Sequence, residues 1–278
     1  MSVPGDTDIR RRVAWHRDSE PHYTRHLNLR RPACMTAADD RLQNRTILIT
    51  GAGSGLGRAL AVDAGKSGAT VILIGRKVPE LETTYDAIEA VGGPQPAIIP
   101  LDLLCATTVE YSSLCAQVAD TFGALHGLVH CAATLGALTP LEHYPQTTWS
   151  EVFTTNLHAP LVLTQACMPL LSESAPASVV FTLDDRLSAY WGAYGLSKAA
   201  VRATVSMLAD ECDGKRLTFG RPRVTVNGVC PGPMRTRLRQ LAFPGELPEA
   251  NPLPEARTAP YLALLSAENG DNGQFLDA

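Results

Sequence analysis

Short apolar segments alternate with longer amphipathic segments along most of the chain. The short segments predict strands at Thr46–Thr50, Ala69–Ile74, Ala97–Leu101, Ala124–Cys131, Ala177–Leu183, Arg223–Val229 and Gly273–Asp277. The longer segments predict helices at Leu56–Ser67, Pro79–Val91, Thr107–Phe122, Thr147–Ser172, Ala189–Cys212 and Pro254–Ser266. Buried strands that alternate with helices form a parallel sheet covered on both faces. We therefore predict an α/β fold, a doubly wound parallel sheet of about seven strands in a single domain.

Two segments depart from this regular alternation. Pro160 and Pro169 fall inside the long helix predicted at Thr147–Ser172, and we expect them to bend or interrupt it. The polar, glycine-containing segment Asp213–Arg221 is interpreted as a surface insertion between a helix and the sixth strand.

The N-terminal part of the chain differs from the rest in composition. Residues 1–34 contain seven arginines and four acidic residues, with few aliphatic side chains and no clear periodicity. We predict a basic, disordered extension over residues 1–40, followed by a nucleotide-binding domain over residues 41–278. The extension has two readings, an arm for RNA or another anionic surface, or a segment without a function of its own.

The overall composition excludes several functional classes. The 278 residues are 45% apolar and 19% charged, with a net charge of −4, so no general attraction to nucleic acid is expected. No apolar run is long enough to cross a membrane, and residues 1–30 lack the core of a secretory signal. The seven cysteines are scattered without Cys-x-x-Cys pairs. We therefore expect a cytoplasmic protein with reduced thiols and no metal site.

A glycine-rich segment directly follows the first predicted strand. It reads Thr50-Gly-Ala-Gly-Ser-Gly-Leu-Gly57 and leads into a predicted helix. Gly51 can form the tight turn, Gly55 allows close approach of a pyrophosphate, and Gly57 permits close packing of helix and strand. Backbone N–H groups at the helix N-terminus then face the phosphates. The alternative is a glycine-rich turn without a ligand.

A tyrosine and a lysine lie four residues apart in Tyr194-Gly-Leu-Ser-Lys198. In a helix this spacing puts both side chains on one face. A nearby cation favours the phenolate and lowers the pKa of a tyrosine, which gives a proton donor or acceptor usable near neutral pH. The alternative, a surface lysine above a packed tyrosine, is common for an isolated pair, but here the glycine-rich segment accompanies it.

Together, the two motifs resemble those of the classical short-chain dehydrogenase/reductase family, from about Arg41 to the C-terminus. Within that family the chain is most similar to bacterial oxidoreductases of the 3-oxoacyl-carrier-protein-reductase type. The resemblance implies a Rossmann-type fold and hydride transfer between a nicotinamide cofactor and a small carbonyl or alcohol substrate. It also implies a homodimer or homotetramer, for which the helix faces around 149–171 and 199–208 are candidates.

The resemblance implies a cofactor site along the carboxyl ends of the strands. Its predicted residues are Gly51, Gly53, Ser54, Gly55, Leu56, Gly57, Arg76, Asp102, Leu103, Ala132, Tyr194, Lys198, Pro231, Gly232 and Thr236. NAD-binding proteins usually carry an acid after the second strand, but this chain has Gly75-Arg76-Lys77 there. A guanidinium can bind the 2′-phosphate that distinguishes NADP(H) from NAD(H). We therefore predict NADP(H) as the preferred cofactor, with NAD(H) as the alternative.

The same resemblance implies a catalytic set of four residues. Tyr194 would exchange a proton with the substrate oxygen, Lys198 would bind the cofactor ribose, and Asn156 would anchor a water near the lysine. The fourth position normally holds a serine, and Asp184 occupies it here. An ionised Asp184 accepts hydrogen bonds only, repels a developing oxyanion and raises the pKa of Tyr194. Thr182 or Ser188 could supply a hydroxyl instead.

Two further features depart from the family or leave alternatives open. Cys131-Ala132-Ala133 stands where Asn-Ala-Gly is common, which predicts weaker cofactor binding. The segment 234–251 contains three arginines and could form a basic lid over an acidic substrate, or simply present a solvated helix face. The sequence thus favours an NADP(H)-dependent oxidoreductase with an atypical site. The alternative is a catalytically impaired nucleotide-binding protein with a scaffold or sensor role.

Overall fold

The computed structural model describes residues 40–219 and 224–278, and the extension predicted at residues 1–40 lies outside this part except for its last residue. The described residues form a parallel seven-stranded sheet in the order β3-β2-β1-β4-β5-β6-β7. Its strands are β1 (Thr46–Thr50), β2 (Thr70–Gly75), β3 (Ala97–Pro100), β4 (Gly127–His130), β5 (Ala177–Thr182), β6 (Val224–Cys230) and β7 (Phe275–Asp277). The predicted doubly wound α/β fold is confirmed.

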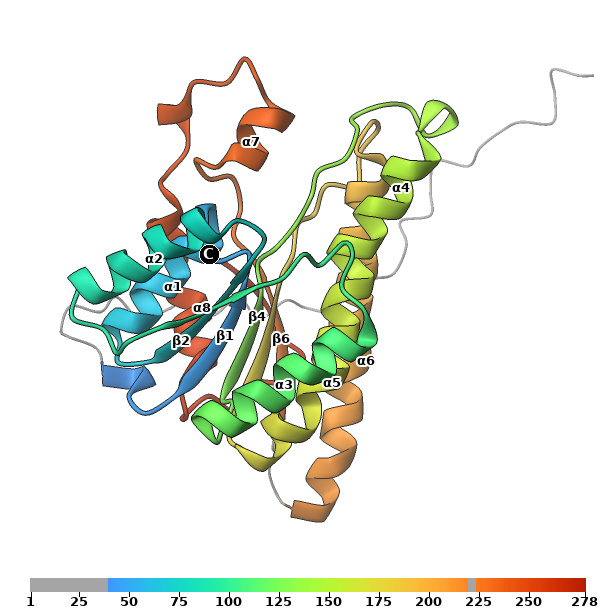
Figure 1. Ribbon diagram of the computed structural model, residues 1–278. Helices are drawn as coiled ribbons and strands as arrows, with labels where there is room; N and C mark the ends of the chain where they lie inside the picture. The colour runs from blue at the N-terminus through green and yellow to red at the C-terminus, as the bar shows by residue number, and fades with distance from the viewer. Residues whose placement is uncertain (1–39, 220–223) are drawn as a thin grey trace, which may run out of the picture. The chain divides into compact units, whose positions relative to one another are not determined.

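Helices cover both faces of this sheet (Figure 1). One face carries α3 (Thr108–Phe122), α4 (Gln146–Phe153), α5 (Ala159–Glu173) and α6 (Gly192–Phe219). The other face carries α1 (Gly55–Lys66), α2 (Val78–Ala90) and α8 (Ala259–Leu265). The short helix α7 (Arg237–Ala242) stands beyond the carboxyl ends of the strands, within the segment that links β6 to α8.

The central strands are buried from end to end because helices pack on both sides of them. Every residue of β1 and of β4 is buried, and the side chains of Ile47, Leu48 and Ile49 have no exposed surface. Continuous apolar strands of this kind are typical of parallel sheets. The strand order reverses between β1 and β4, and in such folds ligands bind at the carboxyl ends of the strands near that point.

Some predicted boundaries are wrong. The polar segment predicted as an insertion at Asp213–Arg221 instead continues α6 as far as Phe219, and its last two residues lie outside the described part. Polar residues continue an exposed helix at little cost when no proline interrupts it, so composition alone was a poor guide. The fourth strand spans only Gly127–His130, and the predicted helix Pro254–Ser266 divides into a 3₁₀ turn at Pro254–Arg257 followed by α8.

The long helix predicted at Thr147–Ser172 is interrupted, and the break lies directly before Pro160. A π-helical turn at Thr154–His158 separates α4 from α5. Pro160 has no N–H for a regular helical bond to the carbonyl of Asn156, which lies in this turn, and this favours the break, whereas Pro169 is accommodated inside α5. No helix in the described part of the chain is long and apolar enough to cross a membrane.

Candidate active site

The glycine-rich turn joins β1 to α1 with very little free space. Gly51 and Gly55 have φ angles of +68° and +53°, a region that favours glycine. A Cβ atom on Gly51 would lie 2.9 Å from the Cα of Ala132, and one on Gly57 would lie 2.4 Å from the carbonyl oxygen of Gly51. Both positions therefore require glycine for close packing, which is the role predicted for Gly57.

The turn lies against two other strand ends. Thr50 Oγ1 accepts hydrogen bonds from the backbone N–H groups of Cys131 (3.2 Å) and Ala132 (3.3 Å), which ties β1 to the segment after β4. On the other side, a Cβ atom on Gly55 would lie 3.3 Å from the methyl group of Thr236. Thr236 caps α7 by accepting from Arg239 N–H. Residues predicted for both ends of the cofactor are thus brought together.

Asp184 occupies the position that faces the Tyr194 hydroxyl. Tyr194 donates a hydrogen bond of 2.9 Å to Asp184 Oδ2. Neither alternative hydroxyl takes that place. Thr182 Oγ1 donates to Cys131 Sγ at 3.6 Å and accepts from Tyr261 at 3.1 Å, whereas Ser188 is exposed at the surface.

Lys198 lies beside Tyr194 but bonds elsewhere in the described structure. Its Nζ donates to the backbone carbonyl of Thr182 at 2.8 Å and lies 5.9 Å from the centre of the Tyr194 ring. Lys198 is 4% exposed, and burial lowers its pKa while the charge of Asp184 opposes that change. A lysine buried among polar atoms at a strand end is uncommon unless a ligand or partner uses it.

The pKa of Tyr194 shifts in the direction opposite to the one predicted for the Tyr–Lys pair. Burial raises this pKa well above its ordinary value, and the charge of Asp184 and the hydrogen bond to it raise the pKa further. The Arg186 guanidinium partly opposes the shift. Burial is thus the largest cause of the raised pKa, and Asp184 adds to it in the predicted direction.

Asn156 lies within the π-helical turn and is 2% exposed. Its side chain accepts from Thr134 N–H (2.8 Å) and donates to the Thr134 carbonyl (2.9 Å) and to Ser197 Oγ (3.1 Å). Ser197 Oγ in turn donates to the carbonyl of Tyr194 at 2.7 Å. These bonds compensate for the low helix propensity of a buried asparagine and tie α4–α5 to the Tyr194 turn of α6. Its predicted role in anchoring a water stays a prediction.

The segment between β5 and α6 carries a cluster of charges and rings. Arg186 Nε lies 3.8 Å from Asp184 Oδ1, and its guanidinium lies 5.4 Å from the Trp191 ring centre and 5.8 Å from that of Phe243. Trp191 also packs 5.8 Å from the Tyr194 ring. The adjacent Asp185 is held by Arg202 at 2.6 Å.

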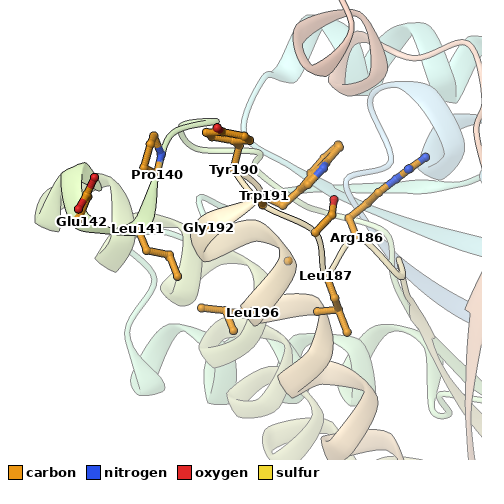
Figure 2. A pocket seen from close by; sticks show the side chains of 12 residues that line it. Pro140, Leu141, Glu142, Arg186, Leu187, Tyr190, Trp191, Gly192 and Leu196 are labelled. Atoms are coloured by element: carbon orange, nitrogen blue, oxygen red, sulfur yellow. The ribbon is translucent and has the colours of Figure 1, made fainter. Parts of the chain in front are cut away.

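A cleft of about 490 Å³ opens beside this segment. Figure 2 shows that Arg186 and Trp191 extend to one side of the loop, away from Leu141, Leu187 and Leu196 on the other. The cleft therefore has an aliphatic side and a side with a cation and an aromatic ring, the latter shared with the surroundings of Tyr194.

A sequence profile for the short chain dehydrogenase family matches residues 45–246, which include the glycine-rich turn, Asn156 and Tyr194–Lys198. The chain belongs to the short chain dehydrogenase family. It is an oxidoreductase of that family, as the resemblance implied.

Several members of the short chain dehydrogenase family are similar over most of their length. The uncharacterised oxidoreductase YciK of Escherichia coli K12 is 36% identical over 233 residues, which are 83% of this chain and 89% of that protein. The structure of a short chain dehydrogenase from Pseudomonas syringae is 40% identical, with a TM-score of 0.82, and the match covers 87% of this chain and 97% of that one.

At least two of the similar structures contain a nucleotide. One of them is a short chain dehydrogenase from Escherichia coli CFT073 in complex with NADPH, 36% identical, with a TM-score of 0.80 and coverage of 86% of this chain and 98% of that one.

The remaining predicted cofactor residues of this family member lie along the same sheet edge. Arg76 is exposed after β2, and within the described residues its side chain forms no hydrogen bond or ion pair. Asp102 follows β3 and accepts from Leu104 N–H at 3.0 Å. Gly232, next to Pro231 in the loop after β6, has a φ angle of +67°. Gly53 lies against α2, because a Cβ atom there would be 3.0 Å from Cβ of Glu80.

Some residues that organise the site were missed from sequence. Ser197 supports Asn156, and Tyr261 fixes the Thr182 hydroxyl from α8. Thr182 was considered only for its hydroxyl, whereas its carbonyl holds Lys198. Ser197 could have been found, because it lies on the same helix one turn after Tyr194. Tyr261 is 79 residues away from Thr182 in sequence and gives no local signal.

Proposed function

We propose that this chain is an NADP(H)-dependent oxidoreductase that transfers a hydride between the nicotinamide and a small carbonyl or alcohol substrate. In this proposal Tyr194, Lys198, Asn156 and Asp184 form the reaction site. The glycine-rich turn, with Arg76, Asp102 and the loop of Pro231, Gly232 and Thr236, holds the cofactor.

A continuous chain of contacts between the two motifs is the observation that carries the proposal. Gly51 packs on Ala132, the neighbouring Cys131 accepts from Thr182, and the Thr182 carbonyl accepts from Lys198. The buried Tyr–Lys pair therefore lies next to the glycine-rich turn at the point where the strand order reverses. A dinucleotide that spans this edge would have its pyrophosphate at one motif and its reactive ring at the other.

The glycine-rich turn fits a pyrophosphate. Gly51 and Gly55 keep the backbone bare of side chains at the start of α1, and Ser54 makes no capping hydrogen bond within the described residues. The first N–H groups of α1 are thus left for an anionic ligand. The exposed guanidinium of Arg76 after β2 suits a 2′-phosphate, and the related Escherichia coli protein crystallised with NADPH supports this preference.

When bound, the cofactor supplies the hydride, and the residues of the chain supply orientation and the proton. Lys198, released from the Thr182 carbonyl, would donate to the ribose hydroxyls. Tyr194 would donate its proton to the carbonyl oxygen of the substrate. Its raised pKa makes Tyr194 a weak acid, so carbonyl reduction at this site is expected to be slow.

A second candidate function follows from the same bond between Tyr194 and Asp184. A carboxylate that accepts the hydrogen bond of the tyrosine also repels a developing oxyanion, which favours a nucleotide-binding protein without useful catalysis and with a scaffold or sensor role. The two candidates share the cofactor site and differ only in turnover.

The test is NADPH binding by fluorescence titration together with turnover of a panel of ketones and acetoacetyl thioesters, for the wild type and Tyr194→Phe. Binding with turnover that collapses in the variant supports the oxidoreductase. Binding without turnover in either protein supports the scaffold or sensor. If neither NADPH nor NADH binds, the assignment of the glycine-rich turn is wrong and both candidates fall.

A further inference from the structure

We propose that the site reduces compounds with a protonated carbon–nitrogen double bond, and that Asp184 binds the positively charged nitrogen of such substrates. The inference rests on the proposed NADPH-dependent hydride transfer and names a second substrate class for the same site. The groups that carry it are Asp184, Tyr194, Arg186 and Trp191.

The charge facing the reacting group is the first argument. When a hydride adds to a carbonyl, the oxygen becomes negative, and Asp184 opposes this change. When a hydride adds to an iminium ion, the nitrogen passes from positive to neutral and no anion forms. The carboxylate favours the protonated imine over the neutral one, so it populates the reactive electrophile at neutral pH. The attraction between Asp184 and the substrate nitrogen weakens as the hydride arrives, because the nitrogen loses its positive charge. Asp184 therefore promotes the reaction by raising the fraction of bound substrate that is protonated, and not by stabilising the transition state.

The second argument concerns the source of the proton. An iminium substrate already carries a proton on its nitrogen. The hydride adds to the carbon with its electron pair, the electrons of the π bond move to the nitrogen, and a neutral amine leaves. Tyr194 then keeps its proton throughout and remains bonded to Asp184 Oδ2. The raised pKa of Tyr194 hinders carbonyl reduction but has no consequence here. A carboxylate has about four acceptor sites, so Asp184 can bind an iminium N–H while Tyr194 stays bonded.

The third argument comes from the cation already held there. The planar guanidinium of Arg186 lies 3.8 Å from Asp184 and faces the rings of Trp191 and Phe243 at 5.4 and 5.8 Å. The place next to Asp184 that this guanidinium occupies, over two aromatic rings, therefore suits a planar nitrogen cation. Arg186 is 39% exposed and also lines the cleft, so it can leave this position for solvent. We expect Arg186 to compete with the substrate for Asp184.

The binding test uses the NADP⁺-saturated protein and tetrahydroisoquinoline, a cyclic amine that is cationic at neutral pH, with uncharged tetralin as the probe of shape alone. Isothermal calorimetry should show that Asp184→Asn weakens amine binding about 10- to 100-fold, as for loss of a hydrogen bond between charged groups, and leaves tetralin unchanged. Asp185→Asn is the matched control, because Asp185 is a neighbouring carboxylate held by Arg202. Arg186→Ala should tighten amine binding.

The turnover test compares dihydroisoquinoline, a cyclic imine, with tetralone, a ketone of similar size. The wild type should reduce the imine faster, and Asp184→Ser should reverse that preference. Tyr194→Phe should abolish ketone reduction and reduce imine turnover by no more than a few-fold.

The outcomes separate this inference from the proposed function. Faster reduction of the ketone by the wild type overturns the inference and leaves the proposed function standing. If NADP(H) fails to bind, the proposed function falls and the inference falls with it. If NADP(H) binds and neither probe is reduced, the inferred imine reduction is overturned whatever the amine affinity, and the scaffold or sensor candidate is favoured.

Discussion

The glycine-rich turn and the β5–α6 segment lie at the same edge of the sheet, yet they depart from the family to very different degrees. At the turn, Gly57 leaves no room for a side chain beside the Gly51 carbonyl. In the β5–α6 segment, an aspartate stands where the resemblance predicts a serine, and it binds the tyrosine hydroxyl. The difference indicates that backbone packing allows only glycine at key positions of the glycine-rich turn. In the β5–α6 segment, by contrast, a change of a few side chains is enough to change the chemistry of the site.

The largest expected effect concerns the tyrosine itself. Tyr194→Phe removes the only proton donor proposed for the carbonyl oxygen, so kcat for ketone reduction should fall about 10²- to 10⁴-fold, whereas NADPH affinity should fall far less, because most of the predicted cofactor contacts remain. Steady-state kinetics and fluorescence titration check both expectations. Tyr85→Phe is the control, because within the described residues that hydroxyl forms one hydrogen bond, accepted from Gln95, and the residue lies on α2. Equal turnover in wild type and Tyr194→Phe would instead favour the scaffold or sensor.

The next effect should have the opposite sign. Asp184→Ser replaces a repelling carboxylate by a donor, and ketone reduction should rise by about 10²-fold, the scale of one oxyanion donor. The pKa of Tyr194 should fall, because the charge of Asp184 and the hydrogen bond to it raise it in the wild type. Reduction needs the protonated tyrosine, so the alkaline limb of the pH–rate profile should move to lower pH. Asp185→Ser should change neither the rate of ketone reduction nor the pKa of Tyr194. If Asp184→Ser is no faster than the wild type, Asp184 contributes to turnover instead of impairing it.

A smaller effect is expected from a substitution in the glycine-rich turn. Gly57→Ala would put a methyl group 2.4 Å from the Gly51 carbonyl oxygen, so the turn must shift. We expect the free energy of unfolding to fall by about 1–3 kcal/mol and NADPH affinity to fall at least about 10-fold. Denaturant unfolding and fluorescence titration measure the two. Gly270→Ala is the matched control, since a Cβ there meets nothing within 4 Å. Full NADPH affinity in Gly57→Ala would contradict the assigned role of the turn.

The sequence predicted what depends on local periodicity and on glycine. Short sequence patterns, each compatible with few local structures, predicted the seven strands, the turn from Gly51 to Gly57 and the Tyr194–Lys198 pair. The contacts that define the site could not be predicted, because they join distant segments. Lys198 bonds the Thr182 carbonyl, whose strand is placed by sheet pairing. Asn156 bonds Thr134 across a π-helical turn that propensity does not foresee.

The basic lid over an acidic substrate, one interpretation of the segment 234–251, remains a prediction. Two of its arginines already have partners within the segment. Arg239 forms a two-bond pair with Glu246 at 2.6 and 2.7 Å and lies 3.7 Å above the Phe243 ring centre. Arg235 donates to the Pro248 carbonyl at 3.0 Å. These arginines fold the segment onto itself, which favours a structural role for their side chains over recognition of an acidic substrate.

The smallest expected effect concerns the choice of cofactor. Arg76 is exposed after β2, and a guanidinium there can bond a 2′-phosphate bidentately. Because the site is open to solvent, we expect Arg76→Ala to weaken NADPH binding only about 10-fold and to leave NADH binding unchanged. The next residue provides a matched control: Lys77 is also a cation, but its ammonium is held by Glu80 at 2.7 Å, so Lys77→Ala should matter less. Paired titrations with both nucleotides measure the ratio of affinities. An equal loss for NADPH and NADH would place Arg76 outside the 2′-phosphate site, and the preference for NADP(H) would then need another residue.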